Sequence, residues 1–280
     1  DLGNYYDAYL IKTDSLGNKL WEKGFGGVNT QGLYFVQQTI DGGYIAVGEN
    51  QVFSDHYHND AYLIKTDSLG NLEWEKTFGG SSDDVGHSVQ QTSDGGYIIT
   101  GFTNSFGASS DIYLIKTNSL GNKEWEKTFG GTNYESGESI QQTSDGGYVV
   151  VGYTSSLGAG GFDAYLIKVD SSGNKLWEKT FGGSNDDYGY SIQQSVDDSY
   201  VLVGYTSSLG EGGTDVWLIK FKFTQIFLDV PPEYWAFEEI GTFYQQGITK
   251  GCKEDTTGLY YCPTDPVRRD QMAVFLTRAF

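Results

Sequence analysis

Hydrophobic and polar residues alternate along this chain in short runs that are interrupted by clusters of Gly, Ser, Asn and Asp. In one stretch the alternating runs cover residues 138–143, 148–153, 163–169 and 175–181. Runs of this length that are rich in Tyr, Val, Ile and Trp, with no stretch at helical period, predict β-strands. The pattern of this stretch therefore indicates four short strands joined by turns.

The same four-strand pattern returns along the chain. The segment DAYLIKTDSLGNKLWEK, followed by FGG, recurs almost unchanged, and its first aspartate falls at Asp7, Asp60, Asp111, Asp163 and, in a truncated copy, Asp215. A second phrase, QQTSDGGY, lies between the copies, and its Asp-Gly and Gly-Gly pairs favour tight hairpin turns. A period near 50 residues with four strands is typical of a propeller blade. We expect residues 1–222 to form a mainly β fold, a β-propeller with four to five four-stranded blades visible.

The order of these phrases carries a resemblance. SIQQTSDGGYVVVGY, a loop, DAYLIK, a turn and LWEK, within residues 139–179, resemble the β-propeller repeats of large secreted bacterial and archaeal surface proteins. They are more distantly similar to WD40 and quinoprotein-type blades. This resemblance implies that the first strand of each blade is innermost and that the strand with the tryptophan is outermost.

Recurring aromatic residues are expected to be structural. They occupy two equivalent positions of the repeat: Trp21, Trp74, Trp125 and Trp177, and Phe25, Phe78, Phe129 and Phe181. Stacked blades bury such rings against one another. A cofactor would not need the same ring in every blade, so we expect no cofactor. The aspartates that open the third strands are expected to brace turns.

Longer, divergent loops alternate with the short turns and must lie on the opposite face, because antiparallel strands reverse at each end. Variation between copies marks a surface on which one backbone carries different chemistry. The candidate ligand face comprises Asp83, Asp84, Tyr134, Glu135, Asp186, Asp187 and Tyr188. It would suit a carbohydrate, a peptide or a cation, although ordinary solvated loop charge explains these residues as well.

Two histidines in one loop, His56 and His58, lie beside carboxylates and form a weak candidate for a transition-metal site. No other period carries a matching cluster, and we expect no metal. The chain has no Gly-x-Ser-x-Gly elbow, no His-Glu-x-x-His helix and no phosphate-binding glycine loop before a helix. A surface-anchored polysaccharide hydrolase or lyase, with its site on the acidic loops, is the alternative to a non-enzymatic protein.

A second domain begins where the repeat stops, near residue 224. All three arginines and the only methionine of the chain follow that point. Apolar residues at helical spacing predict a helix from Tyr234 that ends at Gly247, and a second helix that starts at Asp265 and Pro266. Cys252 and Cys262 flank the connection of about 20 residues between them, and we expect them to form a disulfide.

Residues 226–280 closely resemble an S-layer homology (SLH) domain. The resemblance rests on FLDVP, YWA, GITKGC, YCP and PVRRDQMAVFL, which occur in this order from Phe227 to Leu276. Domains of this family attach proteins non-covalently to cell-envelope polysaccharide. The resemblance implies that the binding residues are Arg269, Gln271, Arg268, Asp229 and Trp235, with Arg269 contacting an anionic group.

Composition narrows the class of partner. The net charge is −19, and so acidic a surface argues against nucleic acid. The chain has no run of 18 apolar residues, so no transmembrane segment is expected. It begins inside a repeat with Asp1, and we expect a fragment truncated at its N-terminus. The expected protein is non-enzymatic and extracellular. It belongs to the cell surface or S-layer, binds cell-wall or envelope polysaccharide, and has other surface-layer proteins or glycans as further candidate partners.

Overall fold

The structure is a computed structural model that describes residues 6–27, 29–53, 57–107, 109–197, 199–210, 212–222, 253–255 and 258–260. The chain divides into two compact units, Asp1–Lys220 and Phe221–Phe280. Every regular element within the described residues is a β-strand.

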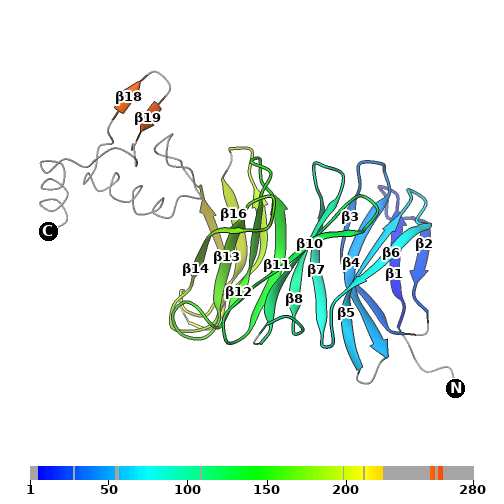
Figure 1. Cartoon of the computed structure of the whole chain (residues 1–280), viewed down its shortest axis with the longest axis horizontal. Coiled ribbons are helices and arrows are strands. Elements are labelled where there is room, and N and C mark those ends of the chain that lie inside the picture. The colour runs from blue at the N-terminus through cyan, green and yellow to red at the C-terminus, as the bar shows by residue number, and fades with distance from the viewer. Residues whose placement is uncertain are drawn as a thin grey trace, which may run out of the picture. The chain divides into compact units, whose positions relative to one another are not determined.

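Four-stranded antiparallel sheets form most of the first unit, and each corresponds to one period of the sequence (Figure 1). Sheet A contains β1 (Ala8–Thr13) and β2 (Lys19–Phe25). Sheet B contains β3 (Gln31–Gln38), β4 (Tyr44–Phe53), β5 (Tyr57–Thr66) and β6 (Leu72–Phe78). Sheet C contains β7 (Asp84–Gln91), β8 (Tyr97–Thr103), β9 (Asp111–Thr117) and β10 (Lys123–Phe129). Sheet D contains β11 (Glu135–Gln142), β12 (Tyr148–Thr154), β13 (Asp163–Val169) and β14 (Lys175–Phe181). Sheet E contains β15 (Asp187–Gln194), β16 (Tyr200–Thr206) and β17 (Asp215–Phe221).

The strands predicted from one period agree with sheet D, apart from the start of the first strand. β11 begins at Glu135 and not at Glu138, because its first residues pair with the end of β12 across a β-bulge. A bulge interrupts the alternation of side chains between the two faces of a sheet. The residues of β11 before the bulge were therefore not predicted as part of the strand.

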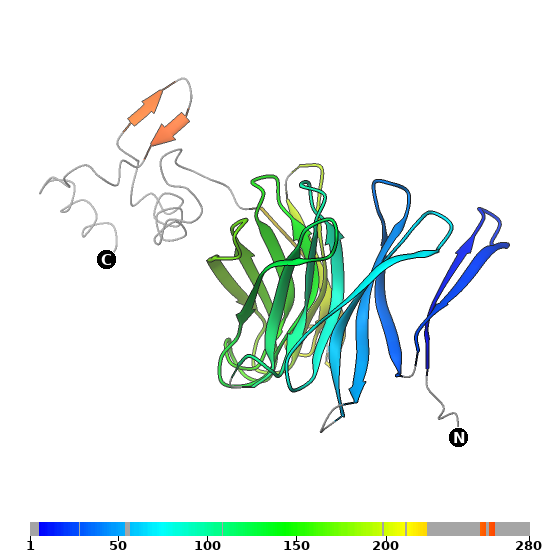
Figure 2. The same cartoon turned by 45° about the vertical axis from the view of Figure 1, so that its right-hand side comes forward.

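The sheets follow one another in chain order, each packed face to face with the next (Figure 1). The first strands β3, β7, β11 and β15 contact one another in succession, which brings one edge of sheets B to E together. Figure 2 shows sheet A, in dark blue, apart from the green and yellow strands of sheets D and E, so the described residues do not close into a ring.

The hydrophobic core lies between successive sheets. Between sheets B and C, Leu63 and Phe78 pack with Tyr97, Ile99 and Tyr113. A second cluster joins sheets C and D, and a smaller one joins sheets A and B. Because the central sheets are covered on both faces, every residue of β9 and β13 is buried. These strands therefore lack the simple inside–outside alternation of a half-exposed sheet.

The recurring tryptophans tie each sheet to the next. The ring of the fourth strand lies against the tyrosine that begins the second strand of the following sheet. The ring centroids are 5.6 Å apart for Trp21 and Tyr44, 5.7 Å for Trp74 and Tyr97, and 6.1 Å for Trp125 and Tyr148. These separations are within the range of favourable aromatic pairs.

A turn glycine completes this contact. Gly121 has a φ of +74°, and a Cβ atom added there would lie 2.6 Å from the ring of Trp74. Gly70 and Gly173 have the same relation to Trp21 and Trp125. Glycine is thus required both by the backbone conformation and by the close approach of the ring.

Buried lysines of the third strands form a second recurring contact. Lys65 and Lys116 are almost fully buried. The Nζ atom of Lys116 lies 2.9 Å from the carboxylates of both Asp94 and Glu124. Lys65 pairs in the same way with Asp41 and Glu73. Two carboxylates therefore compensate each buried ammonium group.

The two end faces of the row expose apolar side chains. Tyr9 and Ile11 of sheet A are 51% and 55% exposed, and Val216 and Leu218 of sheet E are 83% and 67% exposed. The equivalent residues of sheet C are buried: Tyr113, Ile115, Ile112 and Leu114. The end sheets thus present the faces that the central sheets bury against their neighbours.

The second unit is described only in a short hairpin, β18 (Lys253–Asp255) paired with β19 (Gly258–Tyr260). This hairpin falls in the segment expected to connect two helices. The predicted helices at 234–247 and 265–279 lie outside the described residues. Within the part of the chain that is described, no helix is long and apolar enough to span a bilayer.

Candidate functional site

The first strands of sheets B to E each contain a β-bulge at one equivalent position. The register of β3 with β4 shifts between Leu33 and Phe35, and the other three first strands shift in the same place. The unpaired residues are Tyr34, His87, Glu138 and Tyr190, which we call the bulge row. A bulge re-aims one side chain of a strand, and bulges are frequent beside functional sites.

The residue before the bulge is glycine in three of the four sheets. A Cβ atom at Gly86 would lie 2.4 Å from Val47, and one at Gly137 would lie 2.2 Å from Thr100. Both partners belong to the second strand of the preceding sheet. In sheet B this position is occupied by Leu33. The bulge is therefore pressed against the neighbouring sheet.

Members of the bulge row contact one another across the sheets. The rings of Tyr34 and His87 lie 6.0 Å apart between centroids, and Nδ1 of His87 lies 3.2 Å from Oε1 of Glu138. Tyr34 also donates a hydrogen bond to Glu49, 2.5 Å away. Burial raises the pKa of Tyr190, and a hydrogen bond with Tyr205 and the charge of Glu138 raise it further.

Aromatic rings border the bulge row on sheets C to E. We call this set the aromatic ladder: Phe102, Tyr134, Tyr153, Phe162, Tyr188 and Tyr205. Its successive centroids are 4.7 to 6.3 Å apart, and it meets the bulge row at His87 and Tyr190. Tyr34, Tyr134 and Tyr190 remain more than one-third exposed. The result is a partly open aromatic surface with Glu49 and Glu138 beside it.

Ser136, His87 and Glu138 lie together but lack the arrangement of a nucleophilic triad. Ser136 is fully buried, and its Oγ donates to Oε1 of Glu138 at 2.7 Å. Ser136 and Glu138 both approach Nδ1 of His87, so the histidine does not bridge them through its two nitrogens. Burial alone would raise the pKa of Glu138, but the hydrogen bonds from His87 and Ser136 outweigh burial and lower it. The cluster is suited to holding a carboxylate in place.

Three residues of the predicted ligand face need correction. Asp84, Glu135 and Asp187 were expected at the surface, but each is completely buried. Each accepts a hydrogen bond from the second glycine of the preceding Gly-Gly pair, as Glu135 does from Gly131 at 2.7 Å. They brace the connection between sheets, and a surface ligand would not reach them.

Each of these buried acids also lies near the aspartate that opens a third strand. A Cβ atom at Gly130 would lie 1.8 Å from Asp111 and 2.5 Å from Glu135, so both carboxylates press on this glycine. Burial raises the pKa of Asp111, and the negative charge of Glu135 raises it further. The pKa values of Asp60 and Asp163 are raised in the same sense.

The other members of the predicted ligand face lie nearer the surface. Tyr134 and Tyr188 belong to the aromatic ladder. The carboxylate of Asp83 accepts from the backbone of Asn59 at 2.9 Å, and that of Asp186 accepts from Phe162 at 3.0 Å. These two aspartates therefore hold the neighbouring loops.

The weak metal candidate is only half described. His58 is buried, with Nε2 3.9 Å from a carboxylate oxygen of Asp60, whereas His56 lies outside the described residues. Among the residues that the structure describes, no group of three or more His, Cys, Asp or Glu is placed to hold a metal. The candidate envelope-binding and disulfide residues also lie outside the described ranges: Asp229, Trp235, Arg268, Arg269, Gln271, Cys252 and Cys262.

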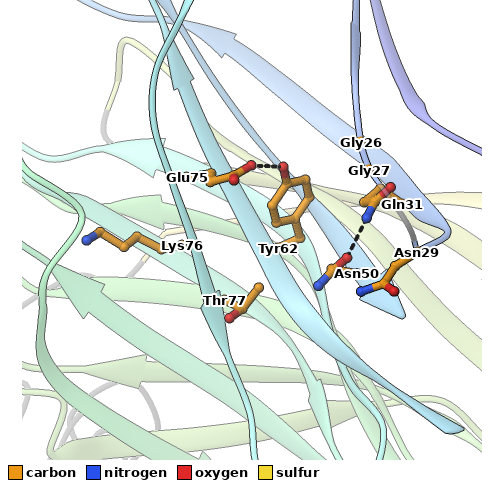
Figure 3. A pocket seen from close by; sticks show the side chains of 9 residues that line it. All are labelled: Gly26, Gly27, Asn29, Gln31, Asn50, Tyr62, Glu75, Lys76 and Thr77. Atoms are coloured by element: carbon orange, nitrogen blue, oxygen red, sulfur yellow. Dashed lines mark hydrogen bonds between the residues drawn. The ribbon is translucent and has the colours of Figure 1, made fainter. Parts of the chain in front are cut away.

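A cavity of about 360 Å³ opens on sheet B, next to the connection from β2 to β3 (Figure 3). Its lining comprises Gly26, Gly27, Asn29, Gln31, Asn50, Tyr62, Glu75, Lys76 and Thr77. Nε2 of Gln31 donates to Asn50 at 2.7 Å, and Tyr62 donates to Glu75. In Figure 3 the amine of Lys76 points away from the amide side chains.

Sequence reasoning missed the bulge row, although a signal was present. His87, Glu138 and Tyr190 occupy one aligned position that differs between otherwise constant copies. The sequence also did not predict the cavity on sheet B. The indication in the sequence was that this repeat has Gln31 and Asn50 where the other repeats have an acid and a threonine. No protein-family model matches the chain, and none of the curated proteins compared with it is similar in sequence.

Proposed function

We propose that this protein is a non-enzymatic, ligand-binding β-propeller protein of the cell surface. The observation that carries this proposal is the bulge row, in which an unchanged backbone feature presents a different side chain in successive sheets. A scaffold that repeats while one aligned position varies suits recognition of an irregular surface better than one repeated reaction.

The propeller itself is part of the proposal. It is supported by four-stranded antiparallel sheets packed in chain order, with their first strands brought together. The apolar end faces of sheets A and E would each pack against a further blade, as the equivalent faces do in sheet C. In a closed ring the bulge row would face the central channel.

The ligand of the bulge row would be a neutral or positively charged polymer. Exposed tyrosines offer flat surfaces on which a sugar ring or an apolar side chain packs, and Glu49 and Glu138 add acceptors and negative charge. An envelope glycan is the ligand that also agrees with the resemblance of the C-terminal segment to an SLH domain.

The experiment for the bulge row compares full-length variants on an array of envelope glycans. Replacing Glu138→Gln together with Tyr190→Ala should weaken glycan binding about tenfold or more, since central aromatic and charged contacts dominate interfaces. Tyr57→Ala, an exposed tyrosine of the hairpin of β4 and β5 that lies outside the row, is the matched control and should bind normally. Equal binding by all three proteins would refute the role of the row.

Attachment to the envelope is tested separately. Deleting residues 226–280 should abolish binding to purified cell-wall sacculi, and Arg269→Ala should weaken it strongly, because a guanidinium binds anionic groups in a bidentate manner. Arg278→Ala changes another arginine of the same segment and serves as the control. Undiminished binding after the deletion would refute the anchor.

A further inference from the structure

The cavity on sheet B exists because one loop differs from its counterparts. In sheet C the segment after β8 folds back, so that Ser105 lies against Gly80 and the ring of Phe106 lies 5.6 Å from that of Tyr113. In sheet B the strands β4 and β5 instead continue as a longer hairpin. Tyr62, the equivalent of Tyr113, therefore has no ring of this kind above it among the described residues.

The surroundings of the glycines that connect the sheets also differ between sheet B and sheets C to E. A Cβ atom at Gly80, Gly131 or Gly183 would lie 2.4 to 2.7 Å from a serine of the folded-back segment. A Cβ atom at Gly27, the equivalent position beside sheet B, would have no heavy atom within 4 Å among those described. Among the described residues, the space that a loop fills in sheets C to E is thus open in sheet B.

The polar groups of the cavity differ in kind from those of the closed junctions. Gln31 stands where the other sheets have Asp84, Glu135 and Asp187, and Asn50 stands where they have threonine. In sheet D the equivalent acid is satisfied, since Glu135 accepts from Thr154 at 2.7 Å. In sheets C and E one carboxylate oxygen, Oδ1 of Asp84 and of Asp187, lacks a partner within the described residues, but a folded-back segment fills the space beside it. The pair in sheet B is neutral, and its members can both donate and accept hydrogen bonds.

One of these polar groups lacks a partner. Gln31 is 7% exposed, and its Oε1 atom has no hydrogen bond within the described residues. A buried acceptor without a donor is unfavourable, and such an atom in a native site calls for an explanation. Oε1 also lies close to Gly26, beside which the carboxylate of Asp7 provides a second acceptor. A ligand that donates a hydrogen bond would satisfy Oε1 of Gln31.

From this geometry we infer that the cavity binds a single sugar residue through its hydroxyl groups. Each sugar hydroxyl can both donate and accept a hydrogen bond. It can therefore pair with the side-chain amides of Asn29, Gln31 and Asn50 and with the hydroxyl of Thr77, which line the cavity. The volume lies at the lower end of small-ligand pockets, which span roughly 300 to 1,000 Å³. Glu75 and Lys76 carry opposite charges at its rim, which favours a neutral ligand.

This site is independent of the bulge row. The two share no residue, and the inference rests on the loop and the amides of sheet B, whether or not the protein is attached to a cell. A glycan that binds at both places would contact them separately, so variants of one site leave the other intact.

The test is a titration of the full-length protein with four neutral sugars: D-glucose, D-galactose, D-mannose and N-acetyl-D-glucosamine. The side-chain amide signals of Gln31 and Asn50 are followed by nuclear magnetic resonance. At least one sugar should shift both signals with a Kd on the order of 1 mM, as expected for a single small ligand. If none of the four shifts either signal, the inference is wrong.

Two variants make the test specific. Gln31→Met removes the unpartnered acceptor at similar volume and should weaken sugar binding about tenfold, followed on the amide of Asn50. Asn50→Thr introduces the residue that the other sheets carry at this position, so the variant should fold. It should also weaken sugar binding, and this is followed on the amide signal of Gln31. Gln38→Met, an exposed glutamine of the same strand, is the control and should leave the affinity unchanged.

Other outcomes would overturn the inference. Shifts of Gln31 and Asn50 caused by Ca²⁺ or methylammonium but by none of the sugars would assign the cavity to a cation. Sugar affinity that is equal in the unchanged protein, Gln31→Met and Asn50→Thr would place binding elsewhere.

Discussion

At the junctions between sheets the same side chains recur in each copy, whereas the four bulges carry side chains of three kinds. The junctions use Trp74 and Tyr97, or their equivalents, to hold one sheet against the next. The bulge row lies on the neighbouring first strands and presents Tyr34, His87, Glu138 and Tyr190. The difference teaches that residues recur where they pack two sheets together, because a substitution at a junction disturbs both sheets at once. The bulged residue is unpaired and partly exposed, so it is freer to vary.

The strongest test of this contrast is Trp74→Ala. Removing the ring should lower the free energy of unfolding by about 3 kcal/mol, because it takes away the aromatic contact with Tyr97 and leaves a void between sheets B and C. Urea denaturation followed by circular dichroism would measure the loss. A change below about 1 kcal/mol would contradict the role of the tryptophan as a junction residue.

A pair of glycine variants separates backbone strain from packing. Gly121 and Gly146 have φ values of +74° and +83°, but a Cβ atom would meet the ring of Trp74 only at Gly121. Gly146→Ala should cost about 1 kcal/mol from the left-handed backbone alone. Gly121→Ala should cost roughly 1 kcal/mol more, from overpacking. Equal losses in the two denaturation curves would show that the ring contact is unimportant.

Asp111→Asn should change how stability depends on pH, with a smaller effect than Gly121→Ala. The pKa of Asp111 is raised in the folded protein by burial and by Glu135, so its proton is held more tightly than in the unfolded chain. The stabilising contribution of this group is complete below its unfolded pKa and is lost as the pH rises through the folded value. The asparagine variant should therefore lose less stability than the unchanged protein between acidic and neutral pH. Melting temperatures across this range would test it, and parallel curves would contradict it.

Asp94→Asn should have the opposite sign and a smaller size. Burial alone would raise the pKa of Asp94, but hydrogen bonds from Thr92, Lys116 and the backbone of Gly96 lower it to about 2. The stabilising contribution of Asp94 is therefore present above its unfolded pKa of about 3.9 and is lost as the pH falls toward about 2. The asparagine variant should lose stability less steeply in this acidic range. Because Asp94 is more than half exposed, solvent weakens the effect.

The smallest effects on stability are expected in the bulge row. Tyr34→Ala and Tyr190→Ala should each change the free energy of unfolding by less than about 0.5 kcal/mol, as for most surface substitutions. Denaturation curves should overlap with that of the unchanged protein. A loss as large as that of Trp74→Ala would show that the row is part of the packing and would remove the contrast.

Much of the local structure followed from the sequence, because turns and strands depend on nearby residues. The Asp-Gly-Gly turns, the repeat of four strands and the structural role of the tryptophans were predicted, and the strands and the tryptophan contacts were confirmed in the described residues. Short runs rich in Tyr, Val, Ile and Trp, bounded by turn residues, were enough to locate β12, β13 and β14 within a residue. These features rest on backbone propensity and on hydrophobic burial within one period.

The burial of the acids and the position of the cavity were decided only by the tertiary structure. The sequence predicted that Asp84 and Glu135 are surface charges, but both are completely buried and accept hydrogen bonds from the backbone of Gly80 and Gly131. Glycine is required at Gly86 and Gly137 because a Cβ atom at either position would lie within 2.4 Å of a side chain of the preceding sheet. In the same way, the cavity beside Gln31 depends on the longer hairpin of β4 and β5, which takes the place of the folded-back segment of the other sheets. The sequence by itself determined each sheet and its turns, whereas contacts between copies decided which side chains are buried and which remain open to a ligand.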